Sequence, residues 1–433
     1  MNRYDSYKDS GIDWIGKIPS HWMNTKYKFH TNILSGFPFK SELFDNEEGF
    51  PILRIRDITS GSSETYYKGD YQEEYLIKRG DLLIGMDGDF NIRWWNNFDV
   101  LLNQRCCSIK EFDTVYRRFL FYVLPFDLRV INDLTYYTTV KHLSNSDIYN
   151  SSLVIPPLPE QQQIVAFLDE KTALIDSLLE KTKQKIALLK EKRMALINEV
   201  VTKGLDPNVA MKDSGVEWIG EIPSHWEMKK VKYLIEEKGG IKIGPFGSSL
   251  KLNTLTEEGI KVYGQGNVIK DDFTLGHRHI PLDRFNADFK QYEIIEGDIL
   301  ITMMGTTGKS KVFKRDYKRG ILDSHLLRLR FNRTKFLSEL FVVILQEGDY
   351  VYNQLSLSSK GSIMQGLNSS IVKELSIVTS SISEQHNISK YLEEQTQLID
   401  DTIGVEEKRI ELLKEYRQSL ISEVVTGKRK VVN

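Results

Sequence analysis

Hydrophobic and polar positions follow a seven-residue period in two long segments of the chain. Between Glu160 and Thr202, apolar residues recur at two seam positions of each heptad, charged residues fill the other faces, and neither Pro nor Gly interrupts the run. The segment from Glu384 to Thr426 has the same spacing. This period is typical of coiled-coil helices. The expected seam residues are Leu168, Ile175, Leu179, Ile186, Leu189, Leu196, Leu392, Ile399, Ile403, Ile410, Leu413 and Leu420.

A helix of this length spans roughly 60 Å and cannot bury its apolar seam alone. We expect the two helices to pair with each other within one chain. If a pseudo-twofold axis relates the halves, the pair is antiparallel and the globular domains lie at opposite ends. The alternative is that each helix packs on its own domain, and the sustained heptads argue against it.

A short sequence occurs twice, as KDSGIDWIGKIPSHW from Lys8 to Trp22 and as KDSGVEWIGEIPSHW from Lys212 to Trp226. Its proline forbids a continuous helix, and we interpret it as a strip whose tryptophans anchor it to a core. The stretches between the repeated pieces, roughly residues 23–150 and 227–375, differ and keep only short echoes such as RGDLLIGMDG and EGDILITMMG. A shared scaffold with divergent inserts suggests two different ligands or half-sites.

The inserts have the patterns of mixed α/β domains. Short apolar runs predict strands at 51–58, 80–85, 297–304 and 325–331, and longer runs predict helices at 117–124 and 336–346. We therefore predict an α+β protein with two mixed α/β globular domains joined by two long helices that form an antiparallel coiled coil. The expected parts are domain 1 at 1–156, helix 1 at 157–204, domain 2 at 205–380 and helix 2 at 381–427.

Composition limits the possible functions of the chain but does not identify one. The chain has 58 Lys and Arg against 60 Asp and Glu, so any nucleic-acid surface must be local. Local runs exist, above all GKSKVFKRDYKR from Gly308 to Arg319. The two cysteines, Cys106 and Cys107, are adjacent and unsuited to an ordinary disulfide, as expected in a reducing compartment. No signal peptide or membrane span is evident, so we expect a cytoplasmic protein without membrane contact.

Fingerprints of catalysis are missing from the sequence. GTTGKS, from Gly305 to Ser310, resembles the end of a P-loop, but Met303 stands where that motif needs a glycine. HExxH, GxSxG, GxGxxG and the Asn-Pro-Pro-aromatic motif of adenine methylation are absent. We expect a non-enzymatic chain that binds no cofactor or metal of its own.

The repeated WIGKIPSHW and WIGEIPSHW, together with GPFGSSL, the two GD(L/I)L turns and PPLPEQQQIVAFLDEKTALID, resemble the specificity subunit of type I restriction-modification systems. The second copy departs from the pattern, with SSISEQ in place of PPLPEQ. The resemblance implies that each domain reads one half of a bipartite double-stranded DNA site. It also implies that the helices act as a ruler and dock two methyltransferase (modification) subunits. Those partners use S-adenosylmethionine, and restriction/translocase subunits add ATP- and Mg-dependent cleavage.

The resemblance does not assign DNA contacts residue by residue. Polar and basic loop residues are the candidates: Lys40, Arg54, Arg56, Asn91, Arg93 and Lys141 in domain 1, and Ser248, Lys251, Gln265, Asn267, Thr306, Lys309 and Lys360 in domain 2. The alternatives are a specificity subunit serving a stand-alone DNA adenine methyltransferase, a self-sufficient nuclease or NTPase, and a structural coiled-coil protein that binds no nucleic acid.

Overall fold

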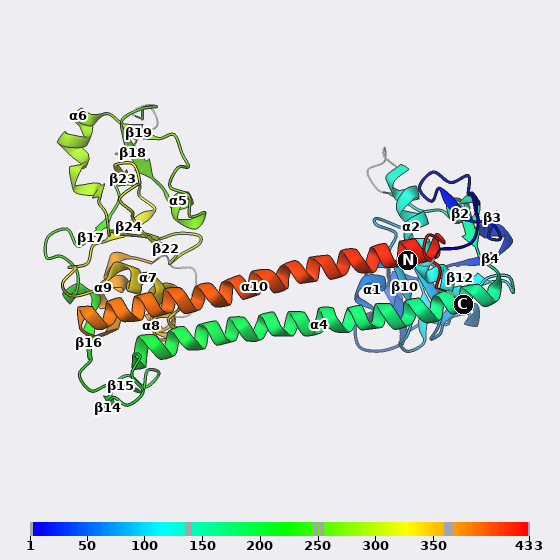
Figure 1. Cartoon of the computed structure of the whole chain (residues 1–433), viewed down its shortest axis with the longest axis horizontal. Coiled ribbons are helices and arrows are strands. Elements are labelled where there is room, and N and C mark those ends of the chain that lie inside the picture. Colours follow the sequence, from blue (N-terminus) through cyan, green and yellow to red (C-terminus); the bar gives the residue numbers. More distant parts are fainter. Residues whose placement is uncertain (1–2, 135–140, 246–249, 251–254, 359–366, 432–433) are drawn as a thin grey trace. The chain divides into compact units, whose positions relative to one another are not determined.

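The computed structural model describes residues 3–134, 141–245, 250, 255–358 and 367–431. The chain forms two compact units (Figure 1). The first unit comprises residues 1–183 and 408–433, and the second comprises residues 184–407. The division falls inside the two long helices rather than at their ends, so each unit consists of a globular domain and a part of each helix.

Two long helices dominate the chain, as the heptad pattern predicts. The helix α4 runs from Leu158 to Lys203 and α10 from Ile382 to Val425, both without a break (Figure 1). Each of the expected seam residues is buried or half-buried. Polar residues of the same heptads are also buried. Thr182 is an example, and its hydroxyl donates a hydrogen bond to the carbonyl oxygen of Leu178 at 2.7 Å.

The two helices pair with each other in antiparallel fashion. In the second unit Lys185 contacts Glu406 and Arg193 contacts Asp400, so residue numbers rise along α4 as they fall along α10. In the first unit, the core that contains Leu168 of α4 also contains residues of α10 and of the globular domain. The predicted antiparallel pair is therefore confirmed, and each helix in addition packs on a globular domain.

The first unit contains two main sheets. One is four-stranded in the order β10-β9-β12-β4 and the other is five-stranded in the order β5-β7-β6-β11-β8. Strands β6 and β11 pair in parallel, while the neighbours in the four-stranded sheet are antiparallel. Two-stranded pairs are β1-β2 and β13-β3. The strands are β1 (Tyr7–Asp9), β2 (Lys17–Pro19), β3 (Met23–Lys26), β4 (Thr31–Ser35), β5 (Phe44–Asp45), β6 (Phe50–Leu53), β7 (Tyr66–Tyr67), β8 (Leu76–Ile77), β9 (Leu82–Gly85), β10 (Ile92–Trp94), β11 (Val100–Leu102), β12 (Cys106–Glu111) and β13 (Ser152–Ile155).

The second unit repeats this topology despite its different sequence. Its sheets have the orders β17-β24-β21-β22 and β19-β18-β23-β20, with β18 and β23 parallel, and its pairs are β14-β15 and β16-β25. Among the described residues, the strand order matches that of the first unit, and the position of β5 is represented by a single antiparallel bridge between Thr256 and His279. The strands are β14 (Met211–Asp213), β15 (Glu221–Pro223), β16 (Glu227–Lys230), β17 (Ile241–Ile243), β18 (Ile260–Tyr263), β19 (His279–Ile280), β20 (Glu293–Ile294), β21 (Ile299–Thr302), β22 (Ser310–Val312), β23 (Gly320–Leu322), β24 (Leu326–Leu329) and β25 (Ser376–Thr379).

Shorter helices complete both units. They are α1 (Ile55–Ser60), α2 (Arg117–Leu134) and α3 (Asn145–Asn150) in the first unit, and α5 (Gln265–Ile269), α6 (Leu282–Arg284), α7 (Ser338–Glu347), α8 (Asp349–Ser358) and α9 (Ser369–Glu374) in the second. The helices predicted at 117–124 and 336–346 are confirmed, although α2 continues further.

One predicted strand is partly wrong. The run predicted as a strand at 51–58 splits, because β6 ends at Leu53 and α1 begins at Ile55. The Asp57 side chain accepts the backbone N–H of Arg54 at 2.8 Å, which caps the helix start. Gly61 ends the helix at a φ of 78°, in the left-handed region that glycine favours.

The repeated strip anchors each globular domain to the start of a long helix. Trp22 is fully buried and donates its indole N–H to Glu160 of α4 at 3.0 Å. Trp226 is buried in the same way and donates to Glu384 of α10 at 3.1 Å. The earlier tryptophans differ: Trp14 is half-buried and packs against the core as expected, whereas Trp218 is 44% exposed.

Candidate nucleic-acid interface

Four loops of the first unit lie next to one another and form a surface that we call the first rim. It comprises residues 36–40, the start of α1 at 54–56, the hairpin turn 86–91 and the turn 103–105. A Cβ on Gly36 would lie 2.0 Å from the carbonyl oxygen of Asn103, so only glycine permits this approach. Asn103 in turn donates its backbone N–H to Leu53 at 3.3 Å, which joins the turn to the start of α1.

Ion pairs connect the hairpin turn to the rest of the first rim. Asp87 accepts from Arg105 at 3.0 Å and contacts His142 at 2.7 Å. Lys141, next to His142, accepts the backbone N–H of Gly88 through its carbonyl oxygen at 3.1 Å. The turn is thus held on two sides, and it exposes Asp89 and Asn91 while Met86 and Phe90 are buried in the core.

Four of the six candidates in domain 1 lie on this rim, and their exposure differs. Lys40, Arg56 and Asn91 are exposed, and Arg54 is half-buried at the N-cap of α1. Arg56 also donates to the Thr65 hydroxyl at 3.2 Å. Exposed basic and amide side chains of this kind can bond to phosphates and base edges.

Arg93 and Lys141 are engaged within the protein. The Arg93 guanidinium donates to the carbonyl of Ile58 at 2.6 Å and to that of Thr59, at the carboxyl end of α1. A cation is favoured there by the helix dipole. The Lys141 ammonium donates to the carbonyl of Asn132 at 3.1 Å and to its side chain. Both side chains hold loops in place rather than projecting free.

Two further exposed residues of the first rim were not among the candidate DNA contacts. Gln104 is exposed, and the Arg105 side chain is 56% exposed although it contacts Asp87. Their neighbours Val100–Leu102 and Cys106–Glu111 are strands, so the pair occupies a tight turn. The polar Asn-Gln-Arg stretch between two apolar runs was the available signal.

The second rim comprises the described parts of the equivalent loops: residues 244–245, the start of α5 at 264–267, the turn 303–309 and the turn 323–325, with Met303 donating its backbone N–H to His325 at 3.1 Å. A Cβ on Gly244 would lie 2.0 Å from the carbonyl oxygen of Asp323, which is as close as a Cβ on Gly36 would lie to that of Asn103. Asp323 binds Arg278 at 2.9 Å, and the same arginine lies against Gly264, which precedes α5. The turn Asp323–His325 and the start of α5 therefore adjoin, as in the first unit.

The two candidates on helix α5, Gln265 and Asn267, have different surroundings. Asn267 is buried and uses its side chain fully, because it accepts from Gly264 at 2.9 Å and donates to the carbonyls of Asp272 at 3.0 Å and Leu275 at 2.9 Å. It shapes the loop. Gln265 is half-buried, and its Oε1 is buried without a hydrogen-bond partner among the described residues.

The turn 303–309 carries the remaining described candidates, Thr306 and Lys309, both exposed. It connects β21 directly to β22, whereas a P-loop leads into a helix. The P-loop resemblance is therefore excluded by local structure as well as by Met303. The candidates Ser248, Lys251 and Lys360 lie outside the described residues.

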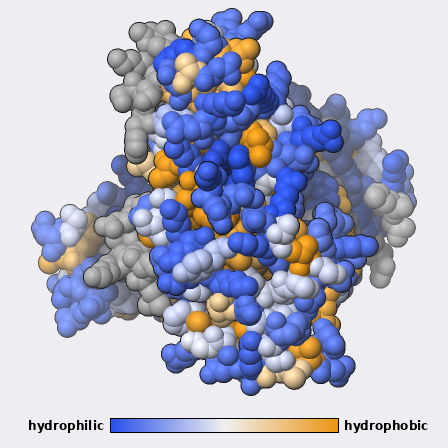
Figure 2. Space-filling model, turned by 90° about the vertical axis from the view of Figure 1, so that its left-hand side faces the viewer, coloured by the Kyte–Doolittle hydropathy of each residue, from blue (hydrophilic) through white to orange (hydrophobic). Residues whose placement is uncertain are grey.

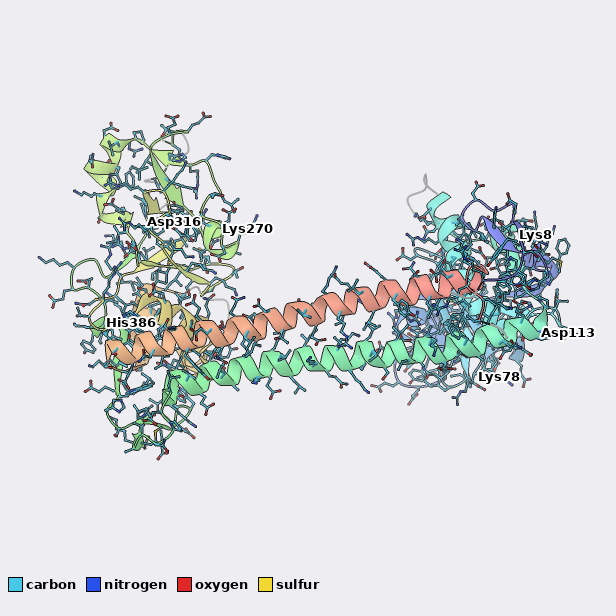
Figure 3. All side chains as sticks on the ribbon, in the orientation of Figure 1. Lys8, Lys78, Asp113, Lys270, Asp316 and His386 are labelled. Atoms are coloured by element: carbon cyan, nitrogen blue, oxygen red, sulfur yellow. The ribbon has the colours of Figure 1, made fainter. Side chains whose placement is uncertain are left out.

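Basic residues at equivalent positions of the two units have the same structural role. Lys311 on β22 binds Asp271 at 2.6 Å, just beyond α5, as Arg93 on β10 binds the end of α1. Lys270 follows α5 as well and is exposed (Figure 3). Exposed lysines at such positions can contact phosphates.

The face shown in Figure 2 is mostly hydrophilic, with scattered hydrophobic residues. Interfaces with DNA are more polar than those between proteins. Within the described ranges, no cluster of three or more His, Cys, Asp or Glu side chains is arranged to hold a metal ion. Among those same residues, no helix has the length and apolar character needed to cross a membrane.

The adjacent cysteines belong to the core. Both Cys106 and Cys107 are buried and free. Burial raises the pKa of the Cys107 thiol to about 12, so it stays protonated at neutral pH. This suits the expected role as small hydrophobic side chains.

Comparison with known proteins gives a consistent result. The family model for the type I restriction modification DNA specificity domain matches residues 19–188 and 223–415. The chain is 28% identical over 427 residues to the type I restriction enzyme EcoBI specificity subunit of Escherichia coli, covering 97% of this chain and 88% of that protein. It is 22% identical over 424 residues to the MjaVIII specificity subunit of Methanocaldococcus jannaschii, covering 96% and 95%.

Solved structures share the fold. The HsdS subunit from Thermoanaerobacter tengcongensis matches with a TM-score of 0.55 at 16% identity, over 95% of this chain and 98% of that one. A chain from work on the assembly and conformational transition of the type I R-M system matches with a TM-score of 0.68 at 16% identity, over 94% and 98%. Because the family model covers most of both repeats and the double architecture recurs in these structures, the chain belongs to the family of type I restriction-modification DNA specificity subunits.

Proposed function

We propose that this chain reads a bipartite double-stranded DNA site, with the first rim on one half-site and the second rim on the other. The observation that carries the proposal is a common framework with different rims. Both units have the same sheet order, and equivalent rim positions hold different side chains, such as Arg54 against Gly264 and Arg105 against His325. One framework with two sets of contacts reads two different sequences.

The chemistry of the rims fits direct readout. Arginine pairs with the major-groove edge of guanine, and glutamine or asparagine with that of adenine. The first rim offers Arg56, Gln104 and Arg105, and the second offers Gln265, whose buried Oε1 lacks a partner among the described residues. Lysines such as Lys40 and Lys309 are suited to phosphates, which set position rather than sequence.

The reaction itself belongs to other subunits in this proposal. Two methyltransferase subunits that use S-adenosylmethionine dock on the paired helices and modify adenine, and restriction/translocase subunits with ATP and Mg²⁺ cut unmodified DNA. The names of the relatives, type I restriction enzyme specificity subunits, support this assignment. A stand-alone methyltransferase complex is the second candidate, since the restriction partner is a separate chain.

The test is a domain exchange read out by methylation. Residues 23–150 are replaced with the insert of a relative, and the variant is produced with the methyltransferase subunit. Mapping of methylated adenines should show one changed half-site and one unchanged half-site. The methyltransferase subunit without this chain, and this chain without that subunit, are controls that should give no site.

A simultaneous change of both half-sites would contradict the assignment of one domain to each half. Methylation by the purified chain alone would contradict the assignment of catalysis to a partner. Cleavage of unmodified DNA after addition of a restriction subunit separates the full type I complex from the stand-alone methyltransferase.

A further inference from the structure

The long helices carry an arginine at the same place of the repeat, Arg193 on α4 and Arg417 on α10. Each binds an aspartate on the facing helix in the same way. The Nε atom of Arg417 lies 2.9 Å from Asp176, and that of Arg193 lies 2.9 Å from Asp400. These two pairs are equivalent parts of the two units.

A second carboxylate completes the site of Arg193 in the second unit. The Nη1 atom of Arg193 donates to Glu347, the last residue of α7. Burial alone would lower the pKa of Arg193, but Glu347 and Asp400 outweigh it and raise the pKa above its ordinary value. Two carboxylates thus hold one half-buried guanidinium.

No described residue of the first unit supplies an equivalent second carboxylate to Arg417. Gln161 accepts the backbone N–H of Tyr116 at 2.8 Å, and Gln385 accepts that of Leu337 at 2.9 Å, which aligns α2 with α7. Counting along both helices from these anchors places Phe126 where Glu347 stands.

Phe126 is turned to a different partner. It stacks on Trp14 with ring centroids 5.9 Å apart and an angle of 15° between the planes. Arg417 uses Nε and Nη2 for Asp176, at 2.9 and 3.3 Å, and its Nη1 has no hydrogen bond to any residue that the structure describes. The nitrogen that receives Glu347 in one unit is therefore available in the other.

Arg417 lines a groove that lies between α2 and the last turns of α10 within the first unit. Its volume is about 350 Å³. Phe121, Phe126 and Ile421 form the apolar floor of the groove. Its basic edge is formed by Arg129, Lys414 and Arg417.

Of the three basic residues on the edge, only Arg417 has a close carboxylate partner among the described residues, Asp176. Lys414 is exposed, and its charge acts on the Glu411 carboxylate without a close ion pair between them. Arg129 has a longer ion pair, with the exposed Asp133 at 4.0 Å. A DNA phosphate would neutralise the basic edge but leave the aromatic floor uncovered. A protein segment with a carboxylate beside an apolar side chain would satisfy both.

We propose that this groove of the first unit binds a segment of a methyltransferase subunit in which an Asp or Glu adjoins an apolar side chain. This inference rests on the proposed function. The partner's carboxylate accepts a hydrogen bond from Nη1 of Arg417, as Glu347 does from Nη1 of Arg193. The apolar side chain next to that carboxylate packs on Phe121 and Phe126. The second unit closes the equivalent place with its own glutamate, so the two repeats engage their partners differently.

The test compares two charge reversals at equivalent positions. Lys414→Glu alters the groove, and Lys190→Glu alters its repeat counterpart, which is exposed and contacts Glu407 at 4.0 Å. Binding of the purified methyltransferase subunit to the full chain is measured by calorimetry. We expect Lys414→Glu to weaken the affinity about tenfold, or about 1.4 kcal/mol, and Lys190→Glu to change it less than twofold.

A second variant, Phe126→Glu, places a carboxylate of the chain itself at the position equivalent to Glu347 and should weaken partner binding as well. Circular dichroism checks that all variants are folded. If wild-type protein binds the subunit and both lysine variants bind equally well, the groove assignment is overturned and the proposed function stands. If wild-type protein does not bind, the proposed function fails together with it. Loss of DNA affinity in Lys414→Glu with unchanged partner affinity would assign the groove to DNA and overturn the proposal.

Discussion

At the scale of single residues, a buried acid sets a pH dependence. Asp127 of α2 is buried and accepts the hydroxyl of Tyr27 at 2.5 Å. Burial raises the pKa of Asp127 to about 7, although the hydrogen bond from Tyr27 opposes the shift. In the unfolded chain this pKa is about 3.9. The folded protein therefore holds a proton that the unfolded chain releases.

We predict that the stability falls as the pH rises through this window. The contribution of protonated Asp127 is complete below about pH 4 and is lost as the pH passes the folded pKa, so wild type should lose about 2 to 3 kcal/mol between pH 5 and pH 8. Asp127→Asn should remove this loss, as measured by denaturant unfolding at both values. Asp133→Asn, on the exposed face of the same helix, is the control. An equal pH dependence in wild type and Asp127→Asn would contradict the prediction.

At the scale of elements, a glutamate near each helix start joins the repeated strip to the long helix. Glu160 accepts from Tyr4 at 2.6 Å and from Trp22 at 3.0 Å, and Glu384 accepts from Trp226 at 3.1 Å. The negative charge also suits the helix N-terminus. Burial alone would raise the pKa of Glu384, but hydrogen bonds from His225, Ser381 and Trp226 outweigh it and hold the pKa at about 2.

Glu384→Ala should destabilise the protein by about 1 to 3 kcal/mol at pH 7, because the buried indole N–H of Trp226 loses its acceptor. The depressed pKa gives the sign of the pH effect. The ionised carboxylate stabilises the fold above about pH 4.3, and this contribution is lost as the pH falls toward 2. Thermal unfolding at pH 7 and pH 3 measures both effects, with Glu394→Ala on the exposed face of α10 as the control. A variant as stable as the control at pH 7 would show that this contact is dispensable.

At the scale of the whole molecule, both long helices continue without a break from one unit into the other. If they set the spacing of the half-sites, adding residues to both should lengthen the DNA spacer. Insertions after Glu180 and after its repeat counterpart Gly404 keep the antiparallel pair matched. One heptad adds about 10 Å, or about three base pairs, and turns the second half-site by nearly a third of a turn.

We therefore predict weak binding after one added heptad and recovery after three, which add about 31 Å, close to one turn of DNA. The measurement is selection of sites from a random duplex library in the presence of the methyltransferase subunit. The spacer in sites selected by the three-heptad variant should be longer by about nine base pairs. Intact binding with an unchanged spacer would show that the helices do not set the distance.

The globular domains show where sequence reasoning stopped. Their inserts keep only short echoes of each other, yet β9 with β10 and β21 with β22 are equivalent hairpins in equivalent sheets. Sheet order depends on contacts between distant strands, and many apolar sequences satisfy the same buried positions. The repeat of the inserts was therefore visible only in the tertiary structure.

The candidate DNA contacts illustrate the same limit for single side chains. Arg93 and Asn267 have the right chemistry for DNA, but one holds the end of α1 and the other shapes the loop after α5. Gln104 and Arg105 were not predicted, although they lie exposed on the first rim. A polar side chain reaches a ligand only if no nearby backbone group takes its hydrogen bonds, and those neighbours come from remote parts of the chain.

The sequence by itself determined the two long helices, their seam, the duplicated strip and the absence of known catalytic motifs. These features are local or periodic, so heptad spacing and residue identity suffice to recognise them. The tertiary structure decided the common sheet order of the two units, the residues that form the rims and the different surroundings of Arg193 and Arg417. Each of these depends on which distant side chains meet, and long-range packing, rather than local pattern, fixes those contacts.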